Sequence, residues 1–447
     1  MDWHPFAGLD HPGYDILVVW DYRELNFNWQ PFFRYDEICL IAWSMGVFAA
    51  SITIHEILPR VTMRVAVNGT LNPIDDRTGI PPAIWHGTHR MLSPVTWRKF
   101  QRRMCDSAEQ YETFHDKAPR RAIDDLKEEL EALETHTIFH VEQMSEWDLA
   151  VISRHDAIFP YDHQVSAWQD LAPIRVLDCG HLPDFSQLLG RLIIDKGRVE
   201  RCFENAGATY AQKAVVQKEI ADQLMRHFDK IAGGDDIVGN VIEIGPGADC
   251  FLTHKWYTRT DRRAKLQLWD LVKVDTSPFG PNLTFEQCDA EVRIKRQPSE
   301  STRFIFSSST IQWFNSLRDF FQECSRVLVP GGYLVVSSFA HGNLRELSSV
   351  TGNGLQLPTP SDWRRNIPSD MEILLIETQD YTITFPTIRQ VLEHFRDTGV
   401  NGVHYCQSPA VTALRLLKEY PQDAETGMYN VTFCPIFIIA RKADPQS

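Results

Sequence analysis

Hydrophobic and polar positions along the chain form two successive α/β patterns. In the first pattern, apolar runs of strand length occur at residues 16–20, 38–43, 63–67, 137–141, 149–153 and 174–177. Continuous apolar runs of this length are typical of buried parallel strands. A polar, charged stretch over about 84–133 interrupts the runs and is predicted to be helical, and another helix is expected over 183–194. The first half therefore predicts a parallel sheet with helices packed on it.

The second pattern starts after a break at Asp195-Lys196-Gly197. Residues 199–232 carry apolar positions at helical spacing, and strand-like runs follow at 240–244, 266–270, 283–287, 304–307, 333–338, 381–385 and 431–440. We expect two α/β domains, over 1–195 and 199–447, each with its own parallel sheet. A chain of 447 residues is too long for one ordinary core, which favours the same division.

Composition and charge limit the classes of protein to which this chain can belong. The apolar fraction of 43% and charged fraction of 23% are ordinary for a globular protein. A net charge of −14 argues against nucleic-acid binding through a general basic surface. The sequence has no bilayer-length apolar run and no secretion signal, and its nine cysteines lack paired spacing. We therefore expect a cytoplasmic protein with reduced thiols, no metal site, and neither membrane nor nucleic acid as partner.

Ser44 lies in a segment that is typical of a nucleophile elbow. The segment Ala42-Trp43-Ser44-Met45-Gly46 follows an apolar run and precedes a predicted helix. Small flanking residues allow the tight strand–turn–helix connection that holds a serine clear of the sheet, although the first small position here is alanine, where glycine is common. The backbone N–H of Met45 is the expected first donor to an oxyanion.

An acid and a histidine follow Ser44 in the chain order that α/β hydrolases use. Asp156 and His181 each come directly after a predicted strand, so both are expected at the same edge of the sheet as Ser44. His181 would then accept the Ser44 proton, and Asp156 would orient the imidazole. In the alternative interpretation, Asp156 caps a helix and His181 is an exposed loop residue. The neighbouring candidates are Asp148, His155 and Asp162.

These segments make the first half, over about 1–194, resemble the pimeloyl-acyl-carrier-protein methyl ester esterases of the BioG family. The matching residues are 42–47, 68–70, 73–76, 79–81, 100–105 and the segments around Asp156 and His181. The resemblance implies an α/β-hydrolase fold and hydrolysis of a carboxylic ester. In that family a strand ending in Gly-Trp-Gly precedes Met-Asp, which Met1-Asp2 match here. We therefore expect this chain to lack that strand, most simply through a start codon assigned too late, which leaves the second oxyanion donor open.

The helical insert would form a lid over the hydrolase site. Four of its basic residues are candidates for docking an acyl carrier protein, whose strong acidity the resemblance implies: Arg98, Lys99, Arg102 and Arg103. The alternative is a solvated pair of helices of mixed charge, because acidic residues lie nearby at 124, 125, 128 and 129.

The second half contains a glycine turn followed by ordered acids. Gly245 and Gly247 follow an apolar strand that contains Glu243, and glycines let a backbone approach a ligand closely. Asp270 ends the next predicted strand, where an acid can accept hydrogen bonds from both ribose hydroxyls. Asp289 follows the strand after that and can meet an adenine amino group. The turn lacks the third glycine of a dinucleotide fingerprint, and a tight turn without a ligand remains the alternative.

This ordered set resembles a class I methyltransferase, and most closely the malonyl-acyl-carrier-protein O-methyltransferases of the BioC family, over about 199–443. The matching residues include Phe203, Thr209-Tyr210, Gln217, 307–314 ending in Gln312-Trp313-Phe314, 343–346 and 351–355. The resemblance implies S-adenosylmethionine as cofactor, bound additionally by Ala290, Ser307, Tyr210 and Gln217. Asp249 and Ser308 depart from the residues that are common in relatives.

Together the two resemblances imply a bifunctional enzyme of biotin synthesis. One half would methylate the free carboxyl of malonyl-acyl carrier protein, and the other would hydrolyse the methyl ester of pimeloyl-acyl carrier protein. A malonyl carboxylate is ionised near neutral pH, so methyl transfer needs no general base. Arg345, Arg364 and Arg365 are either anchors for the acyl carboxylate or surface charges. Two alternatives stay open: a small-molecule methyltransferase fused to an unrelated esterase, and a hydrolase half that only docks the carrier.

Overall fold

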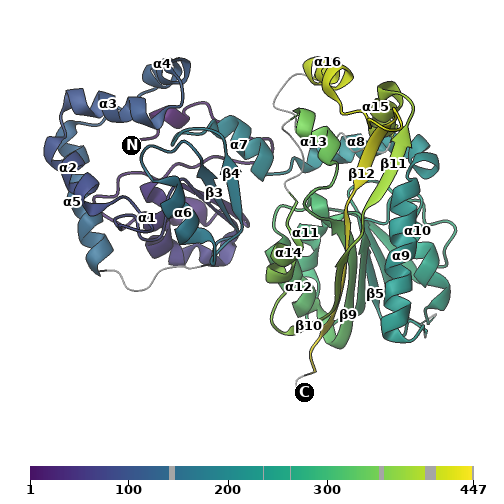
Figure 1. The fold of residues 1–447 in the computed structure, drawn as a ribbon. Coiled ribbons are helices and arrows are strands. Elements are labelled where there is room, and N and C mark those ends of the chain that lie inside the picture. The colour runs from purple at the N-terminus through teal and green to yellow at the C-terminus, as the bar shows by residue number, and fades with distance from the viewer. Residues whose placement is uncertain (140–145, 235, 262, 352–356, 398–408, 445–447) are drawn as a thin grey trace. The chain divides into compact units, whose positions relative to one another are not determined.

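The chain divides into two compact units, Met1–Leu189 and Gly190–Ser447 (Figure 1). The computed structural model describes all residues except 140–145, 235, 262, 352–356, 398–408 and 445–447, and it does not describe the side chains of 139, 206–212 and 409–413. Each unit is described by itself. No helix among the described residues is both long and apolar enough to span a membrane.

The first unit is built on a four-stranded parallel sheet in the order β1-β2-β3-β4. Its strands are β1 (Ile38–Trp43), β2 (Val61–Val67), β3 (Leu149–Ser153) and β4 (Ile174–Leu177), which confirms four of the predicted strands. Helices α1 (Met45–Thr53), α6 (Tyr161–Trp168) and α7 (Phe185–Leu192) each follow a strand. All four strands end toward the same edge, so the loops that follow β1, β3 and β4 can meet there.

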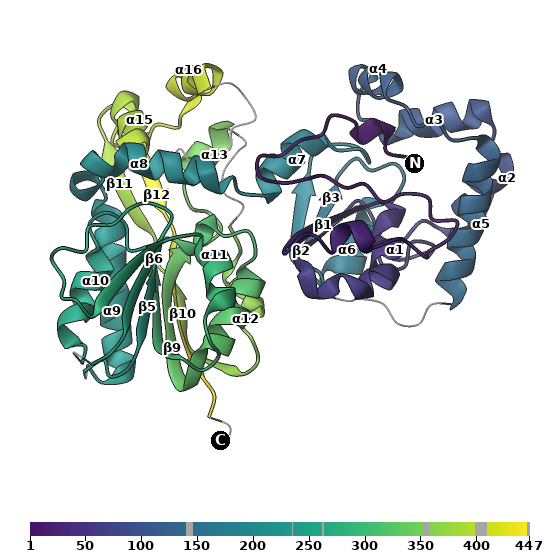
Figure 2. The ribbon, with the colours of Figure 1, turned by 180° about the vertical axis from the view of Figure 1, so that it is seen from behind.

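The predicted helical insert forms four helices grouped along one side of this unit (Figures 1 and 2). They are α2 (Pro82–Met91), α3 (Pro94–Met104), α4 (Ala108–Asp116) and α5 (Ile123–Phe139). One buried residue from each helix, Trp85, Met104, Phe114 and Leu133, joins a single apolar cluster with Phe48 of α1. The insert is therefore packed onto the helix that begins beside Ser44.

Two strand predictions in this unit are wrong. Residues Ile16–Trp20 form no strand, and Leu17, Val18 and Trp20 are each more than a third exposed. An apolar run becomes a strand only where a neighbour pairs with its backbone groups, and this segment does not pair with the edge strand β1. The run predicted at 137–141 is instead the end of α5 up to Phe139, and residues 140–141 lie outside the described part of the chain.

The second unit contains a seven-stranded sheet in the order β10-β13-β9-β8-β5-β6-β7. Strands β5 to β9 run parallel, and β13 and β10 are antiparallel to their neighbours. The strands are β5 (Val241–Ile244), β6 (Leu266–Asp270), β7 (Leu283–Gln287), β8 (Thr302–Ser308), β9 (Leu328–Phe339), β10 (Met371–Thr378) and β13 (Pro435–Lys442). The sequence prediction missed β10, and it merged β13 with β12 (Tyr429–Phe433) into one run at 431–440.

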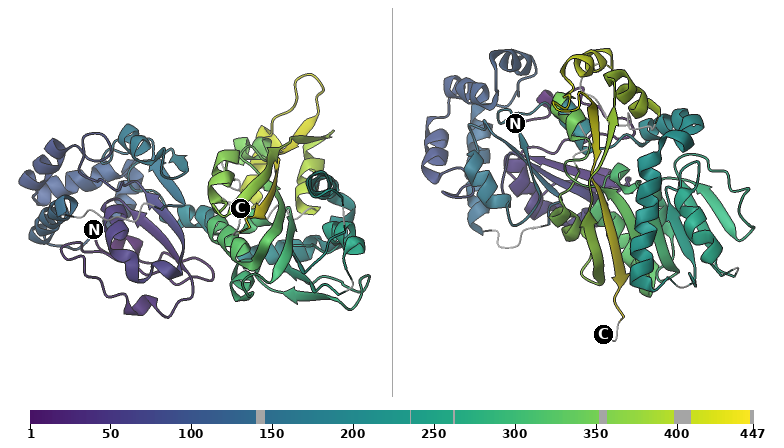
Figure 3. Two further views of the ribbon diagram at one scale, coloured as in Figure 1. Left: turned by 90° about the horizontal axis from the view of Figure 1, so that it is seen from below. Right: turned by 45° about the vertical axis from the view of Figure 1, so that its right-hand side comes forward.

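Helices cover both faces of this sheet, as Figures 1 and 3 show. One face packs on α9 (Val215–Ala232) and α10 (Phe251–Trp256), and the other on α11 (Ala290–Arg293), α12 (Leu317–Val327) and α14 (Pro360–Asn366). Alternate residues of one strand enter the two cores: Phe304 and Phe306 face α9, and Ile305 faces the other side. The remaining elements are α8 (Lys196–Lys213), α13 (Arg345–Thr351), β11 (Tyr381–Phe385, paired with β12), α15 (Ile388–Asp397) and α16 (Pro409–Glu419).

Candidate active sites

Ser44 occupies a sharp turn between β1 and α1. Its backbone has φ 58° and ψ −129°, which is sparsely populated for a residue with a side chain, and its N–H donates to the Val67 carbonyl at 2.9 Å. Neighbouring glycines leave the room that this turn needs: a Cβ on Gly69 would lie 2.1 Å from the Ser44 carbonyl oxygen. Met45 is the first residue of α1, so its N–H lies at the positive end of that helix.

The structure brings the three predicted residues of the hydrolase site together. The His181 Nε2 lies 3.0 Å from the Ser44 Oγ, and the His181 Nδ1 lies 2.9 Å from the Asp156 Oδ2. The Asp156 carboxylate is fixed further by the N–H groups of Ile158 and Phe159, at 2.7 and 2.9 Å. This is the arrangement in which a serine can lose its proton to a histidine that an acid orients.

The alternative candidates for the hydrolase site make other contacts. His181 is only 1% exposed, so it is not an exposed loop residue. The Asp148 carboxylate accepts the Arg64 backbone N–H at 2.8 Å, and His155 pairs with Asp178 at 2.9 Å. Asp162 lies in the first turn of α6. The geometry thus selects Asp156 as the acid beside the histidine.

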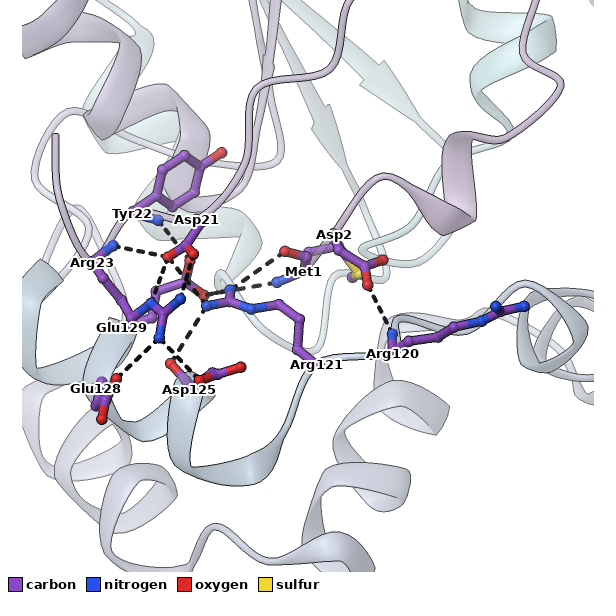
Figure 4. A network of polar contacts seen from close by, with 10 residues as sticks. All are labelled: Met1, Asp2, Asp21, Tyr22, Arg23, Arg120, Arg121, Asp125, Glu128 and Glu129. Carbon is purple, nitrogen blue, oxygen red and sulfur yellow. Dashed lines mark hydrogen bonds and ion pairs between the residues drawn. The ribbon is translucent and has the colours of Figure 1, made fainter. Parts of the chain in front are cut away.

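A network of charges ties the N-terminal segment to the insert (Figure 4). The buried Arg121 side chain lies 2.7 Å from Glu129 of α5 and 3.3 Å from Asp21. The other Glu129 oxygen accepts the Tyr22 backbone N–H at 2.8 Å, and Asp2 accepts the Arg120 N–H at 2.8 Å. Segment 1–22 is therefore held against the start of α5 by hydrogen bonds as well as by charge.

The four basic residues proposed for carrier docking all lie exposed on α3, but they differ in their contacts. Arg103 donates to the Ala157 carbonyl at 2.7 Å, and Arg102 donates to the Cys105 carbonyl at 3.4 Å. Arg98 and Lys99 make no ion pair within the described residues. With Val95, which is 61% exposed, these side chains follow the helical spacing of one outer face of α3.

A cavity in the second unit is lined by most of the residues predicted to bind a cofactor. Gly245 and Gly247 follow β5 with φ of 66° and 67°, a conformation that glycine adopts without strain. A Cβ on Gly245 would lie 2.1 Å from the Thr310 Oγ1. The Gly247 N–H donates to the Asp270 Oδ2 at 3.0 Å, which places the acid at the end of β6 directly against the turn.

Two buried carboxyls lie at this turn. Asp270 accepts the Val272 N–H at 3.0 Å, and burial raises its pKa to about 6. Glu243 accepts the hydroxyl of Thr253 at 2.7 Å and the indole N–H of Trp256 at 2.6 Å, and burial raises its pKa to about 8. Desolvation is the larger effect in both cases, because it disfavours the charged form more than these hydrogen bonds stabilise it.

Three other predicted residues also line the cavity. Asp289 caps α11 by accepting the Glu291 N–H at 3.0 Å, and Ala290 follows it at the cavity wall. Gln217 of α9 is 9% exposed, and its Oε1 has no hydrogen-bond partner. A glycine turn, an adjacent acid and an unpaired buried amide suit an adenosine-bearing ligand.

One prediction at this site needs correction, and one lies outside the described side chains. The Ser307 hydroxyl donates to the Ile244 carbonyl at 2.9 Å and ties β8 to β5, so Ser307 does not line the cavity. The residues after it, 308–310, line the cavity instead. Because side chains alternate along a strand, a shift of one residue moves the predicted contact to the other face. Tyr210 lies on α8, but the structure does not describe its side chain.

Sequence reasoning missed a cation at the cavity wall. The Lys196 Nζ lies 2.5 Å from Glu291 and 3.7 Å from Asp289, and 4.7 Å from the ring centre of Phe314. Lys196 falls in the segment predicted to separate the domains, so its place in the sequence did not indicate a position at the cavity. The apolar spacing of α8 did offer a signal for Val199, which lines the cavity together with Phe203, a residue that matches the family. Within the described residues, no group of three or more His, Cys, Asp or Glu side chains could hold a metal ion.

Comparisons with known proteins find relatives of both units. Residues 9–189 match the model of the pimeloyl-ACP methyl esterase BioG family, and residues 253–336 match a methyltransferase domain. A malonyl-[acyl-carrier protein] O-methyltransferase of Bacteroides fragilis is 31% identical over 453 residues, covering 99% of this chain and 91% of that protein. One from Acinetobacter baylyi is 28% identical over 255 residues, covering 56% of this chain and 98% of its own.

A crystal structure of BioG from Haemophilus influenzae shares 34% identity, with a TM-score of 0.34, over 36% of this chain and 74% of its own. The family models and the full-length relative make the first unit a BioG-type α/β-hydrolase unit, and the second a class I methyltransferase unit whose cofactor is S-adenosylmethionine. The chain belongs to the malonyl-[acyl-carrier protein] O-methyltransferase family and carries a BioG-family unit ahead of its methyltransferase unit.

Proposed function

We propose that this chain performs two reactions of biotin synthesis on substrates carried by acyl carrier protein. The methyltransferase unit would methylate the free carboxyl of malonyl-acyl carrier protein. The hydrolase unit would hydrolyse the methyl ester of pimeloyl-acyl carrier protein. The observation that carries the proposal is the assembled contact of Ser44, His181 and Asp156 in a chain that also holds a glycine turn hydrogen-bonded to Asp270.

The hydrolase geometry supports the following route of ester hydrolysis. The His181 Nε2 takes the proton of Ser44 as its oxygen attacks the ester carbonyl, and the Met45 N–H stabilises the oxyanion that forms. The proton then passes from His181 to the departing methoxide, which leaves as methanol. A water molecule, deprotonated by His181, attacks the acyl-serine and releases the free carboxylate and Ser44. Asp156 holds the imidazole in orientation throughout.

Methyl transfer needs positioning more than proton chemistry. S-adenosylmethionine supplies an electrophilic methyl group on a positively charged sulfur. Gly245 and Gly247 let the backbone approach this cofactor, and the Asp270 carboxylate would hold its ribose hydroxyls. The acyl carboxylate is ionised near neutral pH, so no residue has to remove a proton. Apolar side chains such as Trp313 and Phe314 line the same cavity and would exclude water from the carboxylate.

The exposed face of α3 suits an acidic carrier protein. Arg98 and Lys99 follow the exposed Val95 at helical spacing, which gives a basic face with an exposed apolar residue at its N-terminal end. Charge reversal in R98E/K99E should raise KM for a carrier-bound ester at least tenfold and leave kcat unchanged. R77E, which alters an exposed arginine of a loop in the same unit, is the matched control. Equal KM values for both variants would remove α3 from the docking surface.

Complementation of biotin auxotrophs tests the function as a whole. The intact chain should restore growth without biotin to a strain that lacks the methyltransferase and to one that lacks the methyl esterase. S44A should rescue only the first strain. If soluble protein rescues neither strain, the pathway assignment is wrong. If S44A rescues the esterase-deficient strain as well as the intact chain does, the hydrolase unit acts without this serine.

A further inference from the structure

Asn68 lies beside the hydrolase site, in the segment Asn68-Gly69-Thr70, and the reaction described above gives it no role. Asn68 directly follows β2, and the preceding Val67 carbonyl accepts the Ser44 N–H. The Asn68 side chain is fully buried, and its backbone is left-handed with φ 46°. Asparagine tolerates this conformation better than most residues with a side chain. The residue thus stands at the edge where the strands of the sheet end.

The Asn68 amide joins the ends of three strands. Its Nδ2 donates to the Ser153 Oγ at the end of β3 and to the His181 carbonyl in the loop after β4, both at 2.8 Å. Its backbone N–H donates to the Val151 carbonyl at 2.9 Å. A single buried side chain therefore links β2 and β3 to the loop that carries the catalytic histidine.

The His181 carbonyl is held from a second direction. The Trp43 Nε1 donates to the same oxygen at 2.9 Å, and the Trp43 ring lies 5.2 Å from the imidazole ring. Phe159 stacks against the imidazole at 6.0 Å with an interplanar angle of 9°. The imidazole ring is thus confined by Asp156 and two aromatic rings, and its backbone is confined by two donors.

The contacts around Asn68 require a side chain that donates hydrogen bonds at this position. Both atoms that face the Nδ2, at 2.8 Å, are oxygens, and the His181 carbonyl can only accept. Turning the amide round would place the Asn68 Oδ1 against that carbonyl, and this oxygen has no partner in its present place. Aspartate has nearly the same shape as asparagine but carries a carboxylate there, so it would repel the carbonyl it has to hold.

We propose that Asn68 is a positioning residue for His181. Its amide fixes the His181 carbonyl so that the Nε2 stays within hydrogen-bond reach of the Ser44 Oγ. The proposal rests on the proposed hydrolase function. A displacement of about 1 Å at a catalytic group can cost about 100-fold in rate, so two hydrogen bonds to the histidine backbone are enough to matter.

Two substitutions in the full chain distinguish the effect of the Asn68 side-chain amide from the effect of its left-handed backbone. N68D keeps the shape and tolerates the left-handed backbone, and N68G removes the side chain and relieves any backbone strain. With p-nitrophenyl acetate, an ester that needs no carrier protein, we expect kcat to fall at least tenfold in N68G and further in N68D, with KM unchanged. The labelling rate of Ser44 by a fluorophosphonate should fall in parallel.

T70V is the matched control, because Thr70 is buried in the same segment and its hydroxyl has no partner. It should keep the kcat of the intact chain. Wild-type kcat in folded N68D or N68G, or a rise in KM alone, would overturn the positioning role. If N68D is insoluble, N68G decides the question. If the intact chain hydrolyses the ester no faster than S44A, the hydrolase function itself fails, which is a different result from an effect of Asn68.

Discussion

At the scale of single residues, the hydrolase site depends on positions that exclude a larger side chain. Ser44 has a strained backbone, and the turn that carries it approaches Gly69 closely. The strain persists because the surrounding hydrogen bonds hold it, such as that from the Ser44 N–H to the Val67 carbonyl. The glycines at this site are therefore part of the catalytic geometry.

G69A should reduce ester hydrolysis at least tenfold and lower the melting temperature. A Cβ at residue 69 would lie 2.1 Å from the Ser44 carbonyl oxygen, so the elbow has to shift. G87A is the control, because the nearest atom to its Cβ would be the Met91 Cε at 3.9 Å. Inside helix α2, alanine should stabilise the unit by about 0.5–1 kcal/mol. Paired melting curves and p-nitrophenyl acetate assays check both variants, and equal activity of G69A and G87A would contradict the steric argument.

Glu243 should make the methyltransferase unit less stable as pH rises. Burial raises the pKa of this carboxyl from 4.5 to about 8, so the folded unit holds a proton that the unfolded chain has lost. The free energy of unfolding therefore falls between about pH 4.5 and 8 and levels off above that range. E243Q should remove this part of the pH dependence, so its stability relative to the wild type should increase between pH 5 and 9.

Urea unfolding followed by near-ultraviolet circular dichroism at pH 5, 7 and 9 measures this difference. Asp270 remains in both proteins and contributes the same trend up to its own pKa of about 6. A constant difference between E243Q and wild type across the range would show that Glu243 titrates normally.

At the scale of elements, the apolar pattern located strands that do pair into a sheet, and it failed for an apolar run that finds no partner. The four strands of the first sheet were predicted, whereas Ile16–Trp20 has the same apolar character and no pairing partner. Thr137–Phe139 continue α5, because a short apolar run fits a helix end as well as a strand. The apolar run of β10, residues 373–376, was detectable from sequence but was not predicted.

R121M should destabilise the hydrolase unit by about 3 kcal/mol, because it leaves Asp21 and Glu129 without their buried cation. R23M is the control: the Arg23 side chain is 35% exposed, and its loss should lower stability much less than R121M does. The urea concentration that halves ester hydrolysis reports on this unit alone. The double variant R121M/E129M should recover part of the loss, and no recovery would mean that Arg121 acts through packing, for example on Trp20.

At the scale of the whole molecule, the residues of each proposed site belong to a single unit. Ser44, Asp156 and His181 all belong to the first unit, and every residue that lines the cofactor cavity belongs to the second. The two chemistries are therefore expected to be separable by single substitutions.

S44A should abolish ester hydrolysis and leave methyl transfer unchanged. D270A should lower methyl transfer at least 100-fold, through weaker cofactor binding, and leave ester hydrolysis unchanged. Calorimetric titration with S-adenosylhomocysteine, together with both activity assays on each variant, measures the separation. A loss of both activities in either folded variant would show that the units depend on each other.

The sequence by itself determined the two α/β units, the order of Ser44, Asp156 and His181, and the glycine turn followed by Asp270. These features are encoded locally, because strand ends, turns and chain order place side chains at one edge of a parallel sheet. Only the tertiary structure decided that Ile16–Trp20 stays unpaired, that Ser307 faces the core, and that Lys196 and Asn68 lie at the sites. Strand pairing and the direction of a side chain depend on neighbours far away in the sequence, and periodicity carries no information about those neighbours.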